Sequence, residues 1–87
     1  MKIRIDPHTL ERAKERGTNE EEIRTTIKTG FPIKVKSGRL GKARVYTFNQ
    51  ERSGRFYEQK RVEVIYNIEA DTIVTITVYV FYGKWEG

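Results

Sequence analysis

The residues best suited to chemistry lie near the start of the chain, on one side of a predicted helix. His8, Arg12 and Arg16 follow one another at intervals of four residues, so they lie within about 80° of one another around a helix. Histidine moves protons near neutral pH, and the planar guanidinium of arginine binds phosphate through paired hydrogen bonds. This stripe therefore suits a phosphate site. The alternative is a solvated helix face, on which Arg12 pairs with Glu15.

A second candidate set lies near the end of the chain. Thr77 and Tyr79 share one face of the strand that is richest in β-branched and aromatic residues, because residues two apart in a strand point the same way. A dry core would normally hold valine or isoleucine at such positions. Their hydroxyl groups could orient a substrate, or these could be ordinary half-exposed strand residues.

Positive charge is concentrated in the middle of the chain. The 87 residues include 17 Lys and Arg and 12 Asp and Glu, and residues 31–61 hold 9 of these basic residues and 2 of the acidic ones. Such a block favours a polyanion such as nucleic acid, and it also suits a solubilising surface. With Tyr46 and Phe48 nearby for base stacking, the predicted RNA-binding residues are Lys34, Lys36, Lys42 and Arg44.

The inventory of side chains limits the chemistry. The chain has no cysteine and one histidine, which cannot form a typical zinc site, so we expect no metal and no cofactor. RNA supplies its own nucleophile, the 2′-OH, and a protein that cleaves it has only to orient this group, move protons and neutralise the phosphate. If the chain is an enzyme, its residues suit a metal-independent endoribonuclease that leaves 2′,3′-cyclic phosphate ends.

Alternation of apolar and polar residues predicts a sheet with two helices on one face. The fold class is α+β: a single small domain over residues 1–87, with the order β-α-α-β-β-β-β and two N-terminal helices packed on a curled, mostly antiparallel sheet. Residues 49–55 are expected to form a polar loop, and the aliphatic even-numbered positions from Val74 to Val80 are assigned to the core. The expected helices are 7–16 and 18–30, and the expected strands are 1–5, 31–36, 42–49, 60–69 and 72–82.

Local signals place the helix ends. Asp6 precedes Pro7 and can cap the first helix, which Gly17 then ends in the left-handed conformation. Thr18 and Glu21 have the spacing of a capping box at the start of the second helix. Both helices are short and weakly apolar, so they must rest on the sheet.

The sequence lacks the features of a membrane or secreted protein. No stretch of about 20 apolar residues occurs, and the first four residues already include two basic side chains, unlike a secretion signal. The absence of cysteine fits a reducing compartment. We therefore expect a soluble, cytoplasmic protein.

The segment from residue 8 to residue 23 resembles the opening of a family called domain of unknown function 4258. That opening reads His-x-x-x-Arg-x-x-x-Arg-Gly, then a small polar residue, acidic residues and isoleucine; the matching residues here are His8, Arg12, Arg16, Gly17, Glu20 to Glu22 and Ile23. The family also has a glycine at the end of the second helix and a Thr-Val-Tyr strand, matched by Gly30 and by residues 77–79. Thr18 replaces the usual apolar residue directly after Arg-Gly, and Asn19 follows it in the small polar position.

The element order is also similar to that of RelE-type and BrnT-type toxins, within a wider set of metal-independent ribonucleases that includes barnase-like and colicin nuclease domains. This resemblance implies a RelE-like fold, in which polar residues of the first helix and a hydroxyl on a late strand face a shared RNA cleft. By that analogy, Arg12 and Arg16 hold phosphate, His8 is the acid or base, and Thr77 and Tyr79 orient the substrate. The implied partners are RNA and a cognate antitoxin.

The leading hypothesis is therefore a toxin-like endoribonuclease or RNA-binding domain. A non-enzymatic interaction domain is the alternative, in which the His-Arg stripe only braces the first helix, with Glu63 and Glu69 available to supply carboxylates. A DNA-binding module is a third option. In the interaction domain, the surface for a homodimer or another protein would be formed by Tyr79, Phe81, Tyr82 and Trp85.

Overall fold

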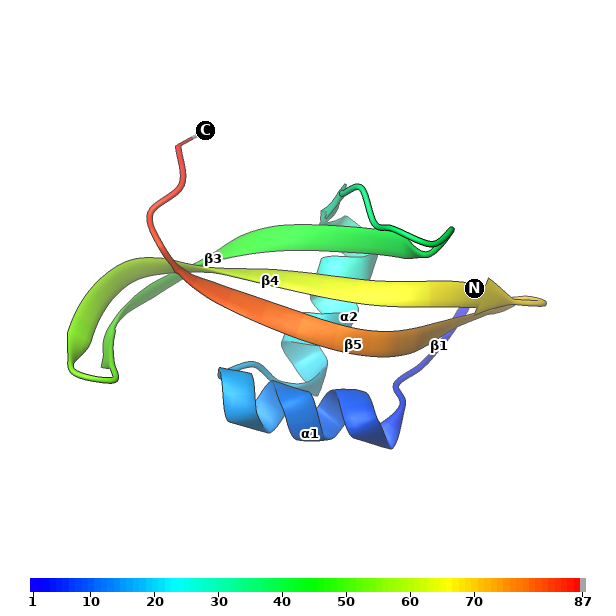
Figure 1. Cartoon of the computed structure of the whole chain (residues 1–87), viewed down its shortest axis with the longest axis horizontal. Helices are drawn as coiled ribbons and strands as arrows, with labels where there is room; N and C mark the ends of the chain where they lie inside the picture. Colours follow the sequence, from blue (N-terminus) through cyan, green and yellow to red (C-terminus); the bar gives the residue numbers. More distant parts are fainter. Residues whose placement is uncertain (87) are drawn as a thin grey trace.

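Two short helices cover one face of a five-stranded sheet (Figure 1). The computed structural model describes residues 1–86. Its order of elements confirms the predicted α+β fold class. No helix in this described part of the chain is long and apolar enough to cross a membrane. In chain order the elements are β1 (Lys2–Arg4), α1 (Pro7–Arg16), α2 (Glu20–Thr29), β2 (Phe31–Pro32), β3 (Leu40–Arg52), β4 (Arg55–Glu69) and β5 (Thr72–Gly83).

The strands lie in the order β1-β5-β4-β3-β2 across the sheet. β1 runs parallel to β5, and the other pairings are antiparallel. β3, β4 and β5 are 13, 15 and 12 residues long, whereas β1 and β2 have three and two residues. Because these short strands cover only part of their neighbours, β5 and β3 both have long open edges. In Figure 1, α2 lies behind the sheet and α1 runs alongside β5.

The prediction of a polar loop at residues 49–55 is wrong, because these residues extend two strands. β3 and β4 are joined by Ser53 and Gly54, which have φ angles of 53° and 80°. Positive φ at both residues is typical of the two-residue hairpin turn whose twist matches that of its strands. The pairing of the two strands also shifts between Thr47 and Gln50, which increases the local twist. This hairpin curls away from the rest of the sheet (Figure 1), and its polar sequence resembled a loop because little of it is buried.

The strand predicted at residues 31–36 is also wrong, since β2 ends at Pro32. Proline has no N–H with which to continue a ladder of hydrogen bonds. The following residues fold over the sheet instead: a Cβ atom on Gly41 would come within 2.6 Å of Val35 and 2.8 Å of Ile33. The alternation of Ile33 and Val35 therefore reflects packing on β3 by a segment that is not itself a strand.

Both helices begin at a side-chain cap. The Asp6 carboxylate accepts a hydrogen bond from the His8 N–H at 2.8 Å, and the Asn19 side-chain oxygen accepts one from the Glu22 N–H at 2.9 Å. The capping box predicted for Thr18 and Glu21 is therefore wrong by one residue. The Thr18 hydroxyl donates to the carboxylate of Glu22 instead, at 2.8 Å.

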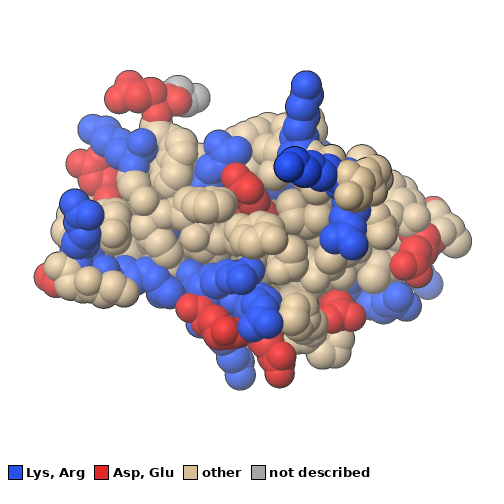
Figure 2. Space-filling view, in the orientation of Figure 1, with Lys and Arg blue, Asp and Glu red and all other residues tan. Residues whose placement is uncertain are grey.

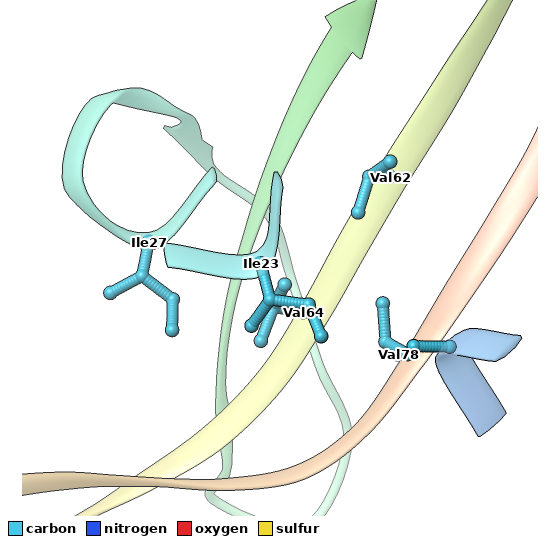
Figure 3. Close-up of a cluster of buried hydrophobic side chains, with 6 residues drawn as sticks. Ile23, Ile27, Val62, Val64 and Val78 are labelled. Atoms are coloured by element: carbon cyan, nitrogen blue, oxygen red, sulfur yellow. The ribbon is translucent and has the colours of Figure 1, made fainter. Parts of the chain in front are cut away.

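The apolar core lies between the helices and the long strands. Figure 3 shows Ile23 and Ile27 of α2 facing Val62 and Val64 of β4, with Val78 of β5 beside them. Four of these five side chains are fully enclosed, and Ile27 is 5% exposed. This cluster accounts for the apolar stripe that the sequence predicts for the second helix.

A β-bulge in β5 changes which of its residues reach the core. The pairing of β4 with β5 skips Ile76, so that Ile65 opposes Thr77 and Tyr66 opposes Thr75. One extra residue reverses the alternation of side chains along the strand. The prediction that Val74 and Ile76 belong to the core is therefore wrong. Thr75 is buried against α1 instead, where its hydroxyl donates to that of Thr9 at 2.9 Å.

We expect Ile23→Ala to lower the free energy of unfolding by about 2–5 kcal/mol, because it leaves a cavity in the centre of the core. Urea unfolding followed by circular dichroism measures this loss. Ile68→Ala is the matched control, since Ile68 is 46% exposed, and it should change stability by less than about 0.5 kcal/mol. Equal losses in the two variants would contradict this description of the core.

Candidate functional site

The N-terminal half of the predicted His-Arg stripe lies on the surface of α1. His8 is exposed in the first turn, next to the capping residue Asp6. The guanidinium of Arg12 pairs with the carboxylate of Glu15 at 2.5 Å. Within residues 1–86, the polar contacts of His8 and Arg12 therefore stay within α1 and its cap, and neither residue hydrogen-bonds to Thr77 or Tyr79.

The third residue of the stripe, Arg16, does reach β5. Its guanidinium donates to the carbonyl oxygen of Val78 at 2.7 Å and lies over the ring of Tyr79, 5.0 Å from the ring centroid. Beyond Val74, β5 has no partner strand on this side, so Arg16 can pass around the open edge of the sheet. The structure thus brings together Arg16 and Tyr79 from the predicted catalytic set, with Thr77 on the same face of β5 as Tyr79.

The four predicted RNA-binding residues are not arranged as expected. Lys34 and Lys36 are exposed in the segment after β2, so the strand that would have placed Lys34 beside Arg44 is not formed. Lys42 is half-buried on β3. Arg44 donates to the Thr29 hydroxyl at the end of α2. Arg44 therefore lies at the edge of the sheet, away from the two exposed lysines.

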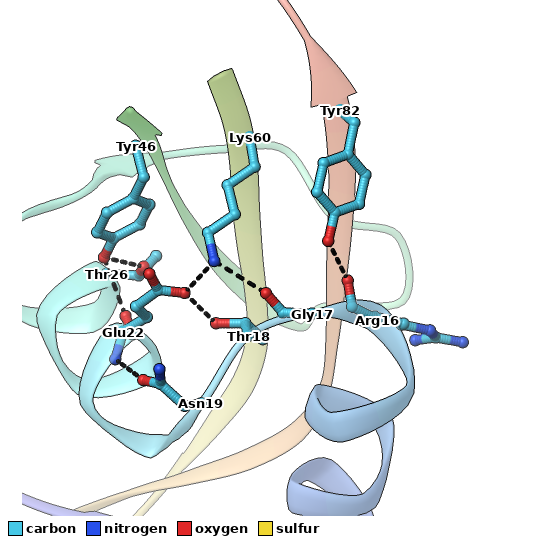
Figure 4. A network of polar contacts seen from close by, with 9 residues as sticks. All are labelled: Arg16, Gly17, Thr18, Asn19, Glu22, Thr26, Tyr46, Lys60 and Tyr82. Atoms are coloured by element: carbon cyan, nitrogen blue, oxygen red, sulfur yellow. Dashed lines mark hydrogen bonds and ion pairs between the residues drawn. The ribbon is translucent and has the colours of Figure 1, made fainter. Parts of the chain in front are cut away.

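A polar network that sequence reasoning missed holds the corner between α1 and α2 (Figure 4). Lys60 of β4 is 8% exposed. Its ammonium group donates to the carbonyl oxygen of Gly17 and pairs with the carboxylate of Glu22, both at 2.8 Å. Tyr82 of β5 donates to the carbonyl oxygen of Arg16 at 2.6 Å. Side chains from two strands thus bind the carbonyl groups that the end of α1 leaves free.

Gly17 is required at this corner for two reasons. Its φ angle is 94°, a left-handed conformation that costs little only for glycine. A Cβ atom would also overlap the hydroxyl of Tyr82 and come within 2.8 Å of Arg52. The Arg16-Gly17 pair therefore has a structural role: the arginine binds the β5 edge, and the glycine lets the helix end approach the sheet.

Burial raises the pKa of the Tyr82 hydroxyl above its ordinary value, although the nearby charge of Arg52 acts in the opposite direction. Burial also raises the pKa of Tyr46, whose hydroxyl contacts Thr26 at 2.9 Å and donates to the carbonyl oxygen of Glu22 at 3.1 Å. Both phenols therefore stay protonated at neutral pH and donate hydrogen bonds to the helices. They act as structural donors in this fold.

Exposed aromatic rings gather on the face of the sheet opposite α2, which we call the open face. Tyr79 and Phe81 of β5 stack with centroids 6.5 Å apart and are 42% and 48% exposed. Phe31 of β2 is 45% exposed, and the guanidinium of Arg61 lies 5.2 Å from its centroid. Figure 2 views this face: uncharged surface covers much of it, with basic and acidic side chains both within it and around it.

Arg61 and Phe31 were not predicted as site residues. Arg61 is directly opposite Phe81 on β5, and its Nε donates to the carboxylate of Glu63 at 2.8 Å. The alternation of Arg61 and Glu63 with two core valines was the available signal, because it places both charges on the face away from the core. Phe31 could not be assigned, since a two-residue strand has no detectable period.

Residues 5–80 match the family described as Domain of unknown function (DUF4258). The chain belongs to this family. No curated protein and no solved structure matches it. The part that matches DUF4258 contains the Arg16-Gly17 pair and residues 77–79, which meet where Arg16 lies over Tyr79.

We expect Lys60→Met to destabilise this DUF4258 domain by about 3 kcal/mol, because it leaves the half-buried Glu22 carboxylate without its cation. Thermal and urea unfolding measure the loss. Arg24→Gln is the matched control, since it removes a cation from the exposed Glu20–Arg24 pair at 3.0 Å, and it should cost about 0.5 kcal/mol or less. Similar losses in both variants would show that the corner does not depend on Lys60.

Tyr82→Phe should cost about 1 kcal/mol at pH 7, the usual contribution of one hydrogen bond. It should also change the dependence of stability on pH. Because the pKa of Tyr82 is higher in the folded chain, its contribution is fully present below about pH 10 and is lost as the pH rises through the folded-state pKa. Between pH 8 and pH 11, the free energy of unfolding should therefore fall less steeply in the variant than in the wild type. Identical slopes would contradict the burial of this hydroxyl.

Proposed function

We propose that this DUF4258 domain binds single-stranded RNA on the open face of its sheet. The observation that supports this proposal is the pairing of exposed aromatic rings with guanidinium groups on one face: Arg16 over Tyr79 and Arg61 over Phe31. Unpaired bases stack on aromatic rings and on guanidinium planes, and arginine also binds the phosphates. Both kinds of contact are available here without any movement of the helices.

The size of the open face fits a short strand. Tyr79, Glu63, Ala43 and Phe31 lie in register across β5, β4, β3 and β2. Three strand spacings correspond to about 14 Å, and sheets of four strands with exposed aromatics can stack two or three bases. Between the rings lie the small side chain of Ala43 and the charged side chain of Glu63, on which a base would not stack. We therefore expect bases on the two aromatic ends and the backbone near Arg61.

Charge supports a polyanionic ligand. The chain has a net charge of +5, which attracts nucleic acid and gives binding that weakens as salt is added. The opposite face also carries aromatic rings beneath cations, with Lys60 over Phe48 and Arg52 over Tyr82, but these rings are half-buried. An RNA ligand also agrees with the expected cytoplasmic location.

Cleavage of RNA by a RelE-like toxin is the narrower form of this proposal. In that form, Arg12 and Arg16 hold phosphate and His8 acts as acid or base. Thr77 and Tyr79 orient the substrate. The step transfers the 2′-OH proton to a base, forms the 2′,3′-cyclic phosphate and protonates the 5′-oxygen that leaves. It requires Arg12 to release Glu15 and His8 to approach the β5 edge, so binding without cleavage is the form that the geometry supports better.

Fluorescence anisotropy with a labelled 12-nucleotide single-stranded RNA tests the proposal. Tyr79→Ala and Phe81→Ala should each weaken binding by about 5- to 150-fold, because one stacked base contributes about 1–3 kcal/mol. Phe56→Ala is the matched control: Phe56 is an aromatic residue, 61% exposed, in the β3–β4 hairpin. Gel analysis of the same RNA after incubation in chelator separates binding from metal-independent cleavage.

Three results would overturn RNA binding. The first is equal affinity in the Tyr79, Phe81 and Phe56 variants. The second is equal affinity for duplex DNA and the single strand, which would indicate a DNA-binding module. If the wild type binds no RNA but forms a homodimer that Tyr79→Ala abolishes in light scattering, the open face is a protein interface. An antitoxin-like protein that binds the same face would support the toxin analogy only if it competes with RNA.

A further inference from the structure

A pocket of about 360 Å³ lies at the β3 edge of the sheet, next to the open face. Its volume is at the lower end of the range for small-molecule sites, about 300–1,000 Å³. It forms because β2 pairs only with Lys42 and Ala43, which leaves the β3 edge open from Arg44 onward. The residues of this pocket that concern its chemistry are Phe31, Arg44, Gln59, Arg61, Trp85 and Glu86.

The C-terminal tail forms one wall of the pocket. The N–H of Trp85 donates to the side-chain oxygen of Gln59 at 2.6 Å, which holds the tail against β4. In Figure 1 this tail leaves β5 and rises above the sheet. Trp85 is thus a large aromatic surface that is fixed beside two arginines.

The two arginines keep most of their hydrogen-bonding capacity. A guanidinium group has five N–H donors. Among residues 1–86, Arg44 donates to the Thr29 hydroxyl, and its buried Nε has no partner. Arg61 donates through Nε to Glu63. Donors therefore remain on both guanidinium groups for an acceptor in the pocket, and no carboxylate of the described chain pairs with Arg44.

The charges in and around the pocket balance one another, which disfavours a doubly charged anion. Glu63 offsets the charge of Arg61, and Glu86 contributes a second carboxylate at the pocket. A phosphodiester carries one negative charge, whereas a free phosphate group carries about two at neutral pH. A phosphodiester next to a base is therefore better matched to this pocket than phosphate alone.

We propose that this pocket binds one nucleotide of an RNA strand, with its base stacked on Trp85 and its phosphodiester at Arg44 and Arg61. The inference rests on the proposed function, because the strand reaches the pocket across the open face. Arg61 connects the two, since it lies directly opposite Phe81 on β5 and lines the pocket from β4. Phe81 and the pocket are thus about two strand spacings apart, or roughly 10 Å.

Trp85 provides a direct test because it is the only tryptophan in the chain. Its fluorescence should be quenched saturably by the dinucleoside monophosphate ApA, which has two bases and one phosphodiester. Adenosine lacks the phosphate and inorganic phosphate lacks the base, so each should quench at least about tenfold more weakly, as expected when a hydrogen bond to a charged group is lost. Equal quenching by adenosine and ApA would overturn the phosphate site.

Charge-matched variants test the two arginines. Arg44→Gln and Arg61→Gln should each weaken ApA binding about tenfold, and Lys36→Gln, which removes the same charge from an exposed position, should leave it unchanged. Thermal unfolding identifies a variant that does not fold. In that case, ApA binding by the other arginine variant tests the proposal. If Lys36→Gln weakens binding as much as the arginine variants do, the effect is one of net charge and the pocket is not the site.

A second comparison separates this inference from the proposed function. Tyr79→Ala should weaken binding of the 12-nucleotide RNA and leave ApA binding unchanged. If the RNA binds through Tyr79 but ApA does not quench Trp85, the pocket inference fails alone. If ApA binds through Arg44 but the 12-nucleotide RNA binds no more tightly than ApA, RNA binding on the open face is overturned. The proposal that the nucleotide in the pocket belongs to an RNA strand is then overturned as well.

Discussion

The arrangement of the helices on the sheet depends on one enclosed ammonium group. Lys60 projects from the central strand β4 and reaches both the carbonyl of Gly17, just after α1, and a carboxylate in the first turn of α2. An enclosed charge is costly unless its partners stay in place, so neither helix can slide along the sheet without leaving it unpaired. Tyr82 and Arg52 add hydrogen bonds to the carbonyls of Arg16 and Glu15. The end of α1 is therefore held by all three long strands.

This constraint leaves the open face and the sheet edges as the surfaces that the helices do not cover. The bulge at Ile76 divides the hydroxyls of β5 between the two sides: Thr75 is turned into the contact with α1, and Tyr79 is turned out to the open face. Arg16 connects the two sides of the sheet. Its backbone is in α1, and its side chain passes around the uncovered edge of β5 to lie over Tyr79. The His-Arg stripe is thus divided: Arg16 binds the Val78 carbonyl and lies over Tyr79, whereas the polar contacts of His8 and Arg12 stay within α1 and its cap.

The elements that were predicted correctly are specified by signals within a few residues. Asp6-Pro7 and Gly17 define α1, Ile23 and Ile27 define the buried side of α2, and alternation defines β4 and most of β5. The errors arise where contacts between distant parts of the chain determine the local structure. Ile33 and Val35 alternate like a strand but pack on Gly41, and the residues around Ser53 are polar but extend a hairpin. The bulge at Ile76 has no local signal, because every residue around it favours a strand. Of the candidate site, Arg16 and Tyr79 could be predicted to meet, whereas Arg61, Phe31 and the pocket could not.

By itself, the sequence determined the α+β order, the two ends of α1 and the family to which the chain belongs, because caps, periodicity and the Arg-Gly motif act over a few residues. Only the tertiary structure decided which side chains share a surface. A single extra residue in β5 exchanges its two faces, and the two-residue length of β2 opens the β3 edge to a pocket. Both outcomes depend on how distant strands pair, and strand pairing is a balance over the whole sheet that no short stretch of residues specifies.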